Sequence, residues 1–330
     1  MTERMLVLRL SALGDVAMTL PAVYSLARTY PKLTVVFVTE NRFLDLIVDA
    51  PANLKVIGVD RKAMRKTGGS IRFLHKLRKV KADAVADLHN VLRTWTADAY
   101  LRFIGKRVVM VDKMRRERRK IKRGGSGTKR AFVDRYFDVF KSLGYPSDTA
   151  VFKGFAFEGV ERGSGVRRIG IAPFARYATK MLPTATVGDV LEHLSNSDEK
   201  VKVSLFGGGE KELAQLEKWR QEYPEMVEYV SGKIGLREEL AVMAGLDVML
   251  TMDSANMHLA SLVGTRVVSV WGSTTPACGF MGWGQSEDDA ICSGLECQPC
   301  TIAGSKECRL GSLACMKSIS ASEIVERLLR

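Results

Sequence analysis

The chain is poor in several features that would place it in a special class of protein. Its 330 residues contain six Cys and nine Pro, too few for a disulfide scaffold or a collagen-like chain. No run of about 18 apolar residues occurs, so we expect no transmembrane helix. Apolar residues make up 46% and charged residues 26% of the chain, which is typical of globular proteins and excludes a wholly disordered chain.

The N-terminal region also lacks the marks of an export signal. Arg9 interrupts the short apolar run that begins at Met5, and no small-residue cleavage site follows it. The run is typical of a buried strand. We therefore expect a cytoplasmic protein.

Acidic residues are outnumbered, 37 against 50 basic residues, for a formal net charge of +13. Most of the excess lies between Lys113 and Arg130, where ten basic residues and one acidic residue give a local charge of +9. The remainder of the chain has a net charge of only +4. Glycines at 124, 125 and 127 predict a mobile loop. Such a segment meets nucleic acid, an anionic membrane surface or a phosphorylated substrate, or is a solvated loop.

Length and hydrophobic pattern predict two α/β domains, since single cores rarely grow beyond roughly 250–300 residues. Apolar runs that predict strands span 5–10, 34–38, 55–59, 84–87 and 107–111 in the first half, and 168–172, 202–206, 248–252 and 266–271 in the second. Helical patterns follow at 16–27, 131–143, 184–194, 210–223, 236–244 and 256–262. Such alternation indicates parallel sheets covered on both faces, and the Gly-rich stretch 159–165 suits a linker.

Ligands of such sheets bind at the carboxyl ends of the strands, so the loops there are the candidate sites. The first is Ser11-Ala12-Leu13-Gly14-Asp15. Gly14 permits close approach of a ligand. Asp15 is either a general base that takes a proton from an attacking hydroxyl or a cap of the helix that follows.

Three later loops carry polar groups that suit a phosphate. Arg176 and Lys180 follow the first strand of the second half, and both are either phosphate ligands or solvated cations. The turn Gly207-Gly208-Gly209 exposes backbone N–H groups at a helix start, although it matches neither a dinucleotide fingerprint nor a P-loop. A carboxylate beyond it, Glu210 or Glu212, either holds ribose hydroxyls or favours the first helical turn.

The stretch Asp253-Ser254-Ala255-Asn256-Met257-His258 opens a helix after a hydrophobic strand. Asp253 and Ser254 lie at the turn and His258 one turn later, so His258 is either a site residue or a satisfied structural histidine. Thr274 follows the next strand, within Gly272-Ser273-Thr274-Thr275-Pro276, where hydroxyls line a phosphate pocket or simply make a turn.

The cysteines Cys297, Cys300, Cys308 and Cys315 have the spacing C-x2-C-x7-C-x6-C. The first pair has the spacing of a structural zinc site and the later two do not form a second close pair. Free thiols are the ordinary state in the cytoplasm.

Taken together and in order, the Ser11–Asp15 loop, Phe206-Gly207-Gly208-Gly209, Asp253–His258 and Gly272–Pro276 resemble glycosyltransferase family 9, the bacterial lipopolysaccharide heptosyltransferases that use ADP-heptose. The Cys-rich tail from Cys297 to Met316 is similar to that of the heptosyltransferase II type. The resemblance implies the GT-B fold, with two Rossmann-like, doubly wound domains that face each other across a cleft. These would span 1–158, which binds the acceptor, and 166–330, which binds the nucleotide sugar, with a last helix that can return to the first domain.

The resemblance also implies roles for single residues. Asp15 matches the catalytic base of an inverting transfer that needs no metal or other cofactor. The nucleotide-sugar donor would be held by residues of several loops, which are Gly14, Lys180, Gly207, Gly208, Glu212, Asp253, Ser254, His258 and Thr274. Among them Lys180 would neutralise the leaving diphosphate, and Glu212, with Glu210 as the competing match, would hold the donor ribose.

One position departs from the family pattern, because Ala255 stands where the family motif D-[ST]-G-x-x-H has Gly. An added methyl there narrows the approach to the diphosphate or demands a negative φ.

We therefore expect a cytoplasmic glycosyltransferase, peripheral to the inner membrane, that moves heptose or a related sugar onto a lipid-linked, lipopolysaccharide-core-type acceptor. The basic segment, through Arg115, Arg116, Arg118 and Arg119, would bind the acceptor and the anionic membrane surface. The alternatives are a GT-B-type nucleotide-sugar epimerase and a polyanion-binding protein. The latter lacks a recognised nucleic-acid-binding module and any aromatic residue in the basic run, so we expect no nucleic-acid partner.

Overall fold

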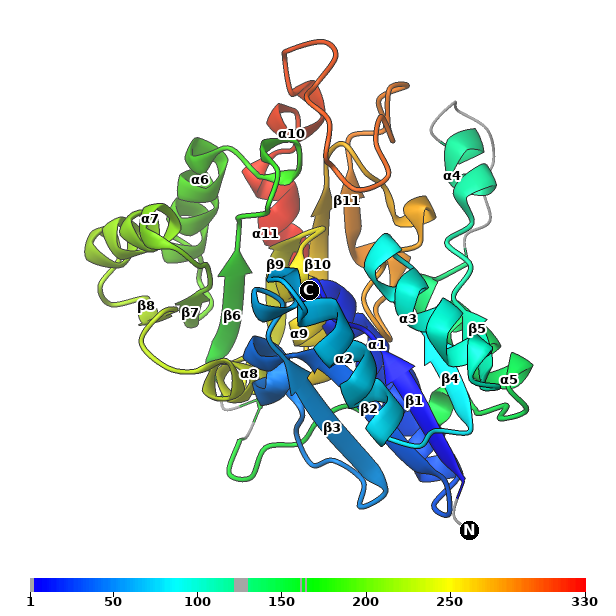
Figure 1. The fold of residues 1–330 in the computed structure, drawn as a ribbon. Helices are drawn as coiled ribbons and strands as arrows, with labels where there is room; N and C mark the ends of the chain where they lie inside the picture. Colours follow the sequence, from blue (N-terminus) through cyan, green and yellow to red (C-terminus); the bar gives the residue numbers. More distant parts are fainter. Residues whose placement is uncertain (1–2, 122–129, 161, 164) are drawn as a thin grey trace. The chain divides into compact units, whose positions relative to one another are not determined.

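The computed structural model describes residues 3–121, 130–160, 162–163 and 165–330 (Figure 1). Contacts divide the chain into two compact units, Met1–Lys113 with Ala131–Lys153, and Met114–Arg130 with Gly154–Arg330, so far as these residues are described. Each unit is built around a parallel sheet of its own. The division into domains at 1–158 and 166–330 stays a prediction.

The first unit contains a five-stranded sheet in the order β3-β2-β1-β4-β5. Its elements are β1 (Arg4–Leu8), α1 (Leu13–Thr29), β2 (Thr34–Glu40), η1 (Asn41–Leu46), β3 (Leu54–Val59), η2 (Ala63–Arg65), α2 (Gly69–Lys79), β4 (Ala84–Asp87), α3 (Leu92–Phe103), β5 (Arg107–Met110), α5 (Phe132–Ser142) and η3 (Thr149–Val151). All neighbouring strands are parallel. The buried strands β1 and β4 are almost wholly apolar, as parallel strands covered on both faces require.

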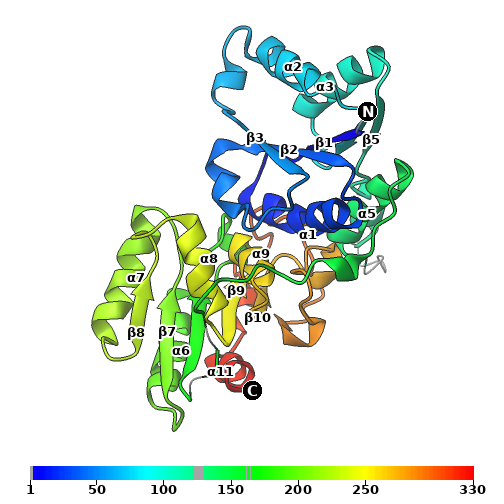
Figure 2. The same cartoon turned by 90° about the horizontal axis from the view of Figure 1, so that it is seen from below.

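Helices cover both faces of this first sheet (Figure 2). α1 and α5 pack together on one face, and α2 and α3 lie side by side on the other. The core between the sheet and α2 and α3 includes Leu6, Val85 and Phe73 together with Ala97 and Leu101 of α3. These residues recur at helical spacing on the inner side of each helix, which leaves the outer side to solvent.

The second unit contains a six-stranded sheet in the order β11-β10-β9-β6-β7-β8. Its elements are α4 (Arg115–Ile121), β6 (Arg167–Ala172), η4 (Ala178–Lys180), α6 (Thr184–Ser195), β7 (Val201–Leu205), α7 (Glu210–Glu222), β8 (Val227–Val230), α8 (Leu236–Ala244), β9 (Val248–Met252), α9 (Ala255–Leu262), β10 (Arg266–Trp271), η5 (Pro276–Cys278), η6 (Glu287–Asp289), β11 (Ala290–Cys292), α10 (Ala314–Lys317) and α11 (Ala321–Leu329). Counted from β6, the order is 3-2-1-4-5-6, that of dinucleotide-binding folds. The last helix, α11, packs on α6, β9 and β10 of its own unit.

The basic segment is not a loop throughout, which corrects the expectation of a mobile loop over 113–130. Arg115–Ile121 form the helix α4, whereas 122–129 lie outside the described residues. Arg, Lys and Glu are good helix formers, and Glu117 in the first turn suits the helix dipole, so a run of charges can be helical. α4 groups with the second unit and lies near η5.

Among the described residues, no helix has the length and hydropathy that crossing a bilayer requires.

Asn53 ties the C-terminus of α1 to the start of β3. Its Nδ2 lies 2.9 Å from the carbonyl oxygen of Ala27, 3.0 Å from that of Tyr30 and 2.8 Å from that of Leu33. The Tyr30 carbonyl also accepts the backbone N–H of Leu33. All three carbonyls lie at or after the end of a helix and have no partner within it, so the side chain supplies a donor that the helix does not.

We expect Asn53→Ala to lower the free energy of unfolding by about 1–3 kcal/mol, because it leaves partly buried acceptors unsatisfied. Chemical denaturation followed by circular dichroism measures the effect. Asn196→Ala, at an exposed position, is the control and should change it by less than about 0.5 kcal/mol. Equal effects of the two substitutions would contradict this role of Asn53.

Candidate active site

In the first unit, charged side chains gather at the carboxyl ends of β1 and β4, where the strand order reverses. The side chain of Arg9, just after β1, is 5% exposed, and its Nη1 donates to the carbonyl of Leu88 at 2.5 Å. Its Nη2 lies 2.7 Å from Oδ1 of Asp15. A buried guanidinium that spans both strand ends therefore holds the candidate base.

Asp15 is the third residue of α1 and makes a second contact, because its Oδ2 accepts the backbone N–H of Ala12 at 3.1 Å. The capping contact that the sequence left open is therefore present. The carboxylate nevertheless keeps 35% of its side chain exposed. It is both anchored and accessible, which a general base requires.

Burial and neighbouring charges oppose each other in their effect on the pKa of Arg9, but both lower the pKa of His89. Burial alone would lower the pKa of Arg9, but the Asp15 carboxylate and its neighbours raise the pKa above its usual value. Burial, and then the charges of Arg9 and Lys113, lower the pKa of His89 to about 3. His89 is therefore neutral at physiological pH, and its buried Nδ1 has no hydrogen-bond partner among the described residues.

Two buried carboxyl groups lie beneath this cluster. Oδ1 of Asp87 accepts the backbone N–H groups of His89 at 2.8 Å and Asn90 at 3.0 Å, which shapes the turn after β4. Burial and the neighbouring charge of Asp87 raise the pKa of Asp98 to about 8. Near neutral pH Asp98 thus retains its proton.

A second group of cations adjoins the Asp15 loop. Nη1 of Arg61 lies 3.3 Å from Oγ of Ser11, and its Nε lies 3.4 Å from a carboxylate oxygen of Glu40. Burial, and then the charges of Arg61 and Arg65, lower the pKa of Arg93. The positive potential here suits an anionic group of a substrate.

Sequence reasoning did not single out Arg9, Asp87, His89 and Asp98. The signal for Arg9 was present, since a charged residue interrupted an apolar strand pattern. Its partner across the sheet depends on the strand order, which the sequence does not show directly.

In the second unit, the corresponding reversal lies between β6 and β9. Nζ of Lys180, from the loop after β6, lies 2.7 Å from Oδ2 of Asp253, which follows β9. Oγ1 of Thr274, after β10, donates to the same oxygen at 2.7 Å. The structure thus brings together three residues that the sequence predicted as donor ligands. The Lys180 and Asp253 side chains are only 12% and 6% exposed.

The Cys-rich tail, from Cys297 to Met316, makes hydrogen bonds to the two loops that carry Lys180 and Thr274. Oγ1 of Thr179 donates to the carbonyl of Gly304, and a Cβ added at Gly304 would strike the aliphatic stem of Lys180. Nε2 of Gln298 donates to the carbonyls of Trp271 and Gly272 at 3.1 and 2.5 Å. The tail therefore fixes both the Lys180 loop and the loop after β10.

The helix α9 begins just after Asp253, the partner of Lys180. Ser254 is its N-cap, with Oγ 3.3 Å from Oγ1 of Thr251, and His258 is buried in the first turns. Ala255, which replaces the Gly of the family pattern, is the first helical residue and does not adopt a positive φ. An alanine therefore fits here without backbone strain.

The glycine turn after β7 has one of its N–H groups occupied. Oε2 of Glu212 accepts the backbone N–H of Gly208 at 2.9 Å. A Cβ added at Gly207 would lie 3.2 Å from Phe174 and 3.3 Å from the same Glu212 oxygen. Glu212 therefore turns back onto its own loop. Neither this contact nor the position of Glu210, the first residue of α7, tests which of the two would hold a ribose.

The remaining predicted residues lie on α1, on the segment after β6 and on α4. Gly14 lies in the first unit next to Asp15, in the first turn of α1. Arg176 is exposed, with its guanidinium 5.5 Å from the centre of the Tyr177 ring. Arg115, Arg116 and Arg119 belong to α4. Their roles stay predictions.

No disulfide joins the six cysteines, all of which the structure describes. Burial, and then the neighbouring thiols, raise the pKa of both Cys300 and Cys315. Among the described residues, no group of three or more His, Cys, Asp or Glu side chains is arranged to hold a metal ion.

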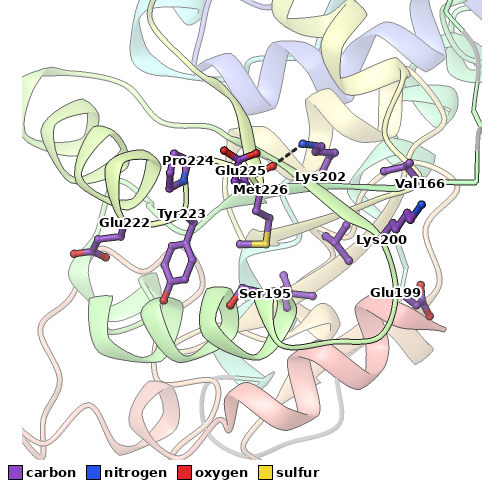
Figure 3. Close-up of a pocket in the computed structure, with 12 residues that line it drawn as sticks. Val166, Ser195, Glu199, Lys200, Lys202, Glu222, Tyr223, Pro224, Glu225 and Met226 are labelled. Atoms are coloured by element: carbon purple, nitrogen blue, oxygen red, sulfur yellow. Dashed lines mark hydrogen bonds between the residues drawn. The ribbon is translucent and has the colours of Figure 1, made fainter.

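A pocket of about 470 Å³ lies elsewhere in the second unit (Figure 3). Its lining residues include Lys200, Lys202, Tyr223 and Met226, and Nζ of Lys202 donates to the carbonyl of Glu225 at 2.5 Å. It adjoins the amino end of β7, at the opposite edge of the sheet from Lys180 and Asp253. Ligands of such sheets bind at the carboxyl edge, so this pocket is not the candidate active site.

Comparisons with known proteins identify the family of the chain. The family model of glycosyltransferase family 9 (heptosyltransferase) matches residues 70–311. Lipopolysaccharide heptosyltransferase 1 of Pseudomonas aeruginosa is 26% identical over 321 residues, which cover 90% of this chain and 86% of that protein.

Two solved structures share the fold. A glycosyltransferase family 9 protein from Veillonella parvula superposes with a TM-score of 0.71 at 19% identity, and covers 99% of this chain and 98% of its own. The E. coli heptosyltransferase WaaC with ADP-2-deoxy-2-fluoro heptose gives 0.66 at 20% identity, and covers 91% and 97%. The fold is therefore GT-B, with two Rossmann-like α/β domains. By its matching family model, the chain belongs to glycosyltransferase family 9 and is a heptosyltransferase-type glycosyltransferase.

Proposed function

We propose that this enzyme transfers heptose, or a related sugar, from ADP-heptose to a lipopolysaccharide-core-type acceptor, with inversion at the anomeric carbon and Asp15 as the general base. The observation that carries the proposal is the accessible Asp15 carboxylate, held by the buried Arg9 where the strand order reverses. The heptosyltransferase relatives, one of them solved with an ADP-heptose analogue, support the choice of donor.

In the proposed step, an acceptor hydroxyl oxygen attacks the anomeric carbon. The bond from that carbon to the diphosphate oxygen breaks, and ADP leaves with the electron pair. Asp15 takes the hydroxyl proton and later releases it to solvent. Attack from the face opposite the leaving group inverts the configuration.

The surroundings of Asp15 favour it over His89 as the base. Arg9 favours the ionised carboxylate, which can accept a proton, and fixes its direction. His89 is only 8% exposed, whereas the Asp15 side chain is 35% exposed, so an acceptor hydroxyl reaches the carboxylate more readily than the imidazole. We assign it no proton transfer.

For the donor, we propose that Lys180 and the N–H groups at the start of α9 neutralise charge that grows on the leaving diphosphate. Asp253, Ser254, His258, Thr274 and the glycine turn shape that site. No step requires a metal ion.

We further propose that Arg115, Arg116, Arg118 and Arg119 contact the phosphates and acidic sugars of a lipid-linked acceptor, and that the enzyme works in the cytoplasm at the inner membrane surface. The charge of the segment and the lipopolysaccharide heptosyltransferase relatives support this.

Asp15→Asn should lower the rate of transfer by roughly 10²- to 10⁴-fold, because the general base is lost while the acceptor for the Ala12 N–H is kept. Release of ADP in the presence of acceptor measures the rate. Donor binding, followed by calorimetry, should be retained, and Asp45→Asn at an exposed site of the same unit should leave both unchanged. Substantial turnover by Asp15→Asn would rule out its role as the base.

ADP-heptose should raise the unfolding temperature of the enzyme more than UDP- or GDP-sugars at equal concentration, because a ligand that binds only the folded state stabilises it. An equal thermal shift with ADP-heptose, UDP-sugars and GDP-sugars would contradict the proposed donor.

Lys180→Met should weaken ADP-heptose binding roughly tenfold or more, through the loss of a charge-assisted contact. The matched control is Lys200→Met, at the opposite edge of the same sheet. A shift with ADP-heptose that is as large in Lys180→Met as in the wild type would contradict the proposed donor site.

Replacement of the four arginines by serine should raise the KM for the acceptor roughly tenfold and reduce its dependence on salt, while donor binding stays the same. Steady-state kinetics at several salt concentrations provide the measurement. The control removes equal charge at four exposed lysines, Lys32, Lys55, Lys200 and Lys218. If both variants respond alike, the effect is one of net charge and the segment has no specific role.

A further inference from the structure

The helix α3 presents apolar side chains to solvent. Leu92, Trp95 and Phe103 are 74%, 39% and 89% exposed, and Ala99 is exposed between them. The spacing of three, four and four residues places all four on one side of the helix. The opposite side, with Ala97 and Leu101, packs into the core. We call Leu92, Trp95, Ala99 and Phe103 the apolar stripe.

Trp95 is held in position within the apolar stripe. Its indole Nε1 donates to Oδ1 of Asn90 at 2.7 Å, and the amide Nδ2 of Asn90 in turn donates to the carbonyl of Val111 at 2.7 Å. The polar atom of the ring is thereby satisfied by the protein. The exposed surface of the Trp95 ring is apolar, and the ring is already fixed in one orientation. Little conformational entropy is therefore lost when the ring contacts a partner.

Basic side chains flank the apolar stripe. The neighbouring helix α2 lies beside α3 on the same face of the sheet (Figures 1 and 2) and exposes Arg72, Arg78 and Lys79, with Ile71 72% exposed among them. The two helices contain one acidic residue, Asp98, and it is buried. The surface is therefore both apolar and positively charged.

We propose that the outer face of α2 and α3 docks onto an anionic lipid bilayer, with the apolar stripe inserted at the level of the headgroups and the α2 cations bound to lipid phosphates. This rests on the proposed function, in which the acceptor is lipid-linked. A bilayer offers apolar chains and negative charge at one surface, and Trp suits its interface. A second copy of the chain would instead bring like charges together.

The position of α3 connects this surface to the chemistry. Leu92 follows His89 by three residues, so the apolar stripe begins at the carboxyl end of β4, the edge of the sheet that also carries Arg9 and Asp15. A bilayer that binds the stripe brings lipid-linked acceptors to the edge of the unit where the base lies.

Vesicle sedimentation tests the proposal. The wild-type enzyme should bind phosphatidylcholine vesicles that contain about 30% phosphatidylglycerol, and bind pure phosphatidylcholine vesicles far less. Leu92→Ser/Phe103→Ser should weaken the binding roughly tenfold or more, because the inserted apolar area is lost. Arg72→Ser/Arg78→Ser/Lys79→Ser should remove the preference for the anionic lipid.

The matched control is Ile234→Ser/Leu310→Ser, which removes apolar side chains that are 42% and 69% exposed in the second unit and should bind vesicles like wild type. Phe103→Ser alone provides a milder variant if the double variant unfolds. Unchanged vesicle binding by the stripe variants overturns the proposal. So does a change from dimer to monomer in sedimentation equilibrium with vesicle binding intact, which would identify a second copy as the occupant.

Activity on an acceptor without its lipid separates this proposal from the proposed function. The stripe variants should transfer sugar to such a water-soluble acceptor as fast as wild type, and fall behind only when the acceptor is presented in anionic vesicles. A slower reaction with the water-soluble acceptor would overturn the docking role. If the wild-type enzyme transfers no heptose at all but the stripe variants lose vesicle binding, the docking surface stands and the proposed function fails.

Discussion

Two ion pairs, Arg9 with Asp15 and Lys180 with Asp253, occupy equivalent places in the two sheets, and the parallel arrangement of the strands dictates where they lie. Parallel neighbours cannot be joined by tight turns, so each connection crosses back over the sheet and all carboxyl ends meet at one edge. Where successive crossovers leave in opposite directions, between β1 and β4 and between β6 and β9, the loops diverge and leave room for a ligand. Both pairs lie at these points.

The pairs differ in which partner faces water. Arg9 is buried and bonded to the Leu88 carbonyl, whereas the Asp15 carboxylate reaches the surface. Lys180 and Asp253 are both largely withdrawn from solvent, and Thr274 bonds the same carboxylate oxygen. Because removal of ions from water costs several kcal/mol per ion, such pairs persist only with good geometry and further hydrogen bonds. In the proposed function, the first arrangement presents the base, and the second provides a cation for the diphosphate of the donor.

Much of this could be predicted from local sequence. The strands of both sheets have almost unbroken apolar runs. Asp15, Lys180, Asp253 and Thr274 lie on the segments that follow β1, β6, β9 and β10. Short, mixed strands such as Val227–Val230 were not predicted, because packing decides their state. The helix at Arg115–Ile121 was not predicted, because a run of like charges is equally typical of a solvated loop. The pairing of Arg9 with Asp15 and the proton on Asp98 depend on burial and strand order, which no local pattern encodes.

Lys180 already has a carboxylate partner 2.7 Å away before any donor arrives. A diphosphate that binds as proposed must therefore share this cation with Asp253, and it gains less from the contact than it would from an unpaired lysine. As the glycosidic bond to the diphosphate breaks, the leaving oxygen acquires further negative charge and competes better for the same ammonium group. In the proposed function this contact would strengthen along the reaction coordinate. An interaction that favours the transition state over the ground state raises turnover without holding the substrate too tightly.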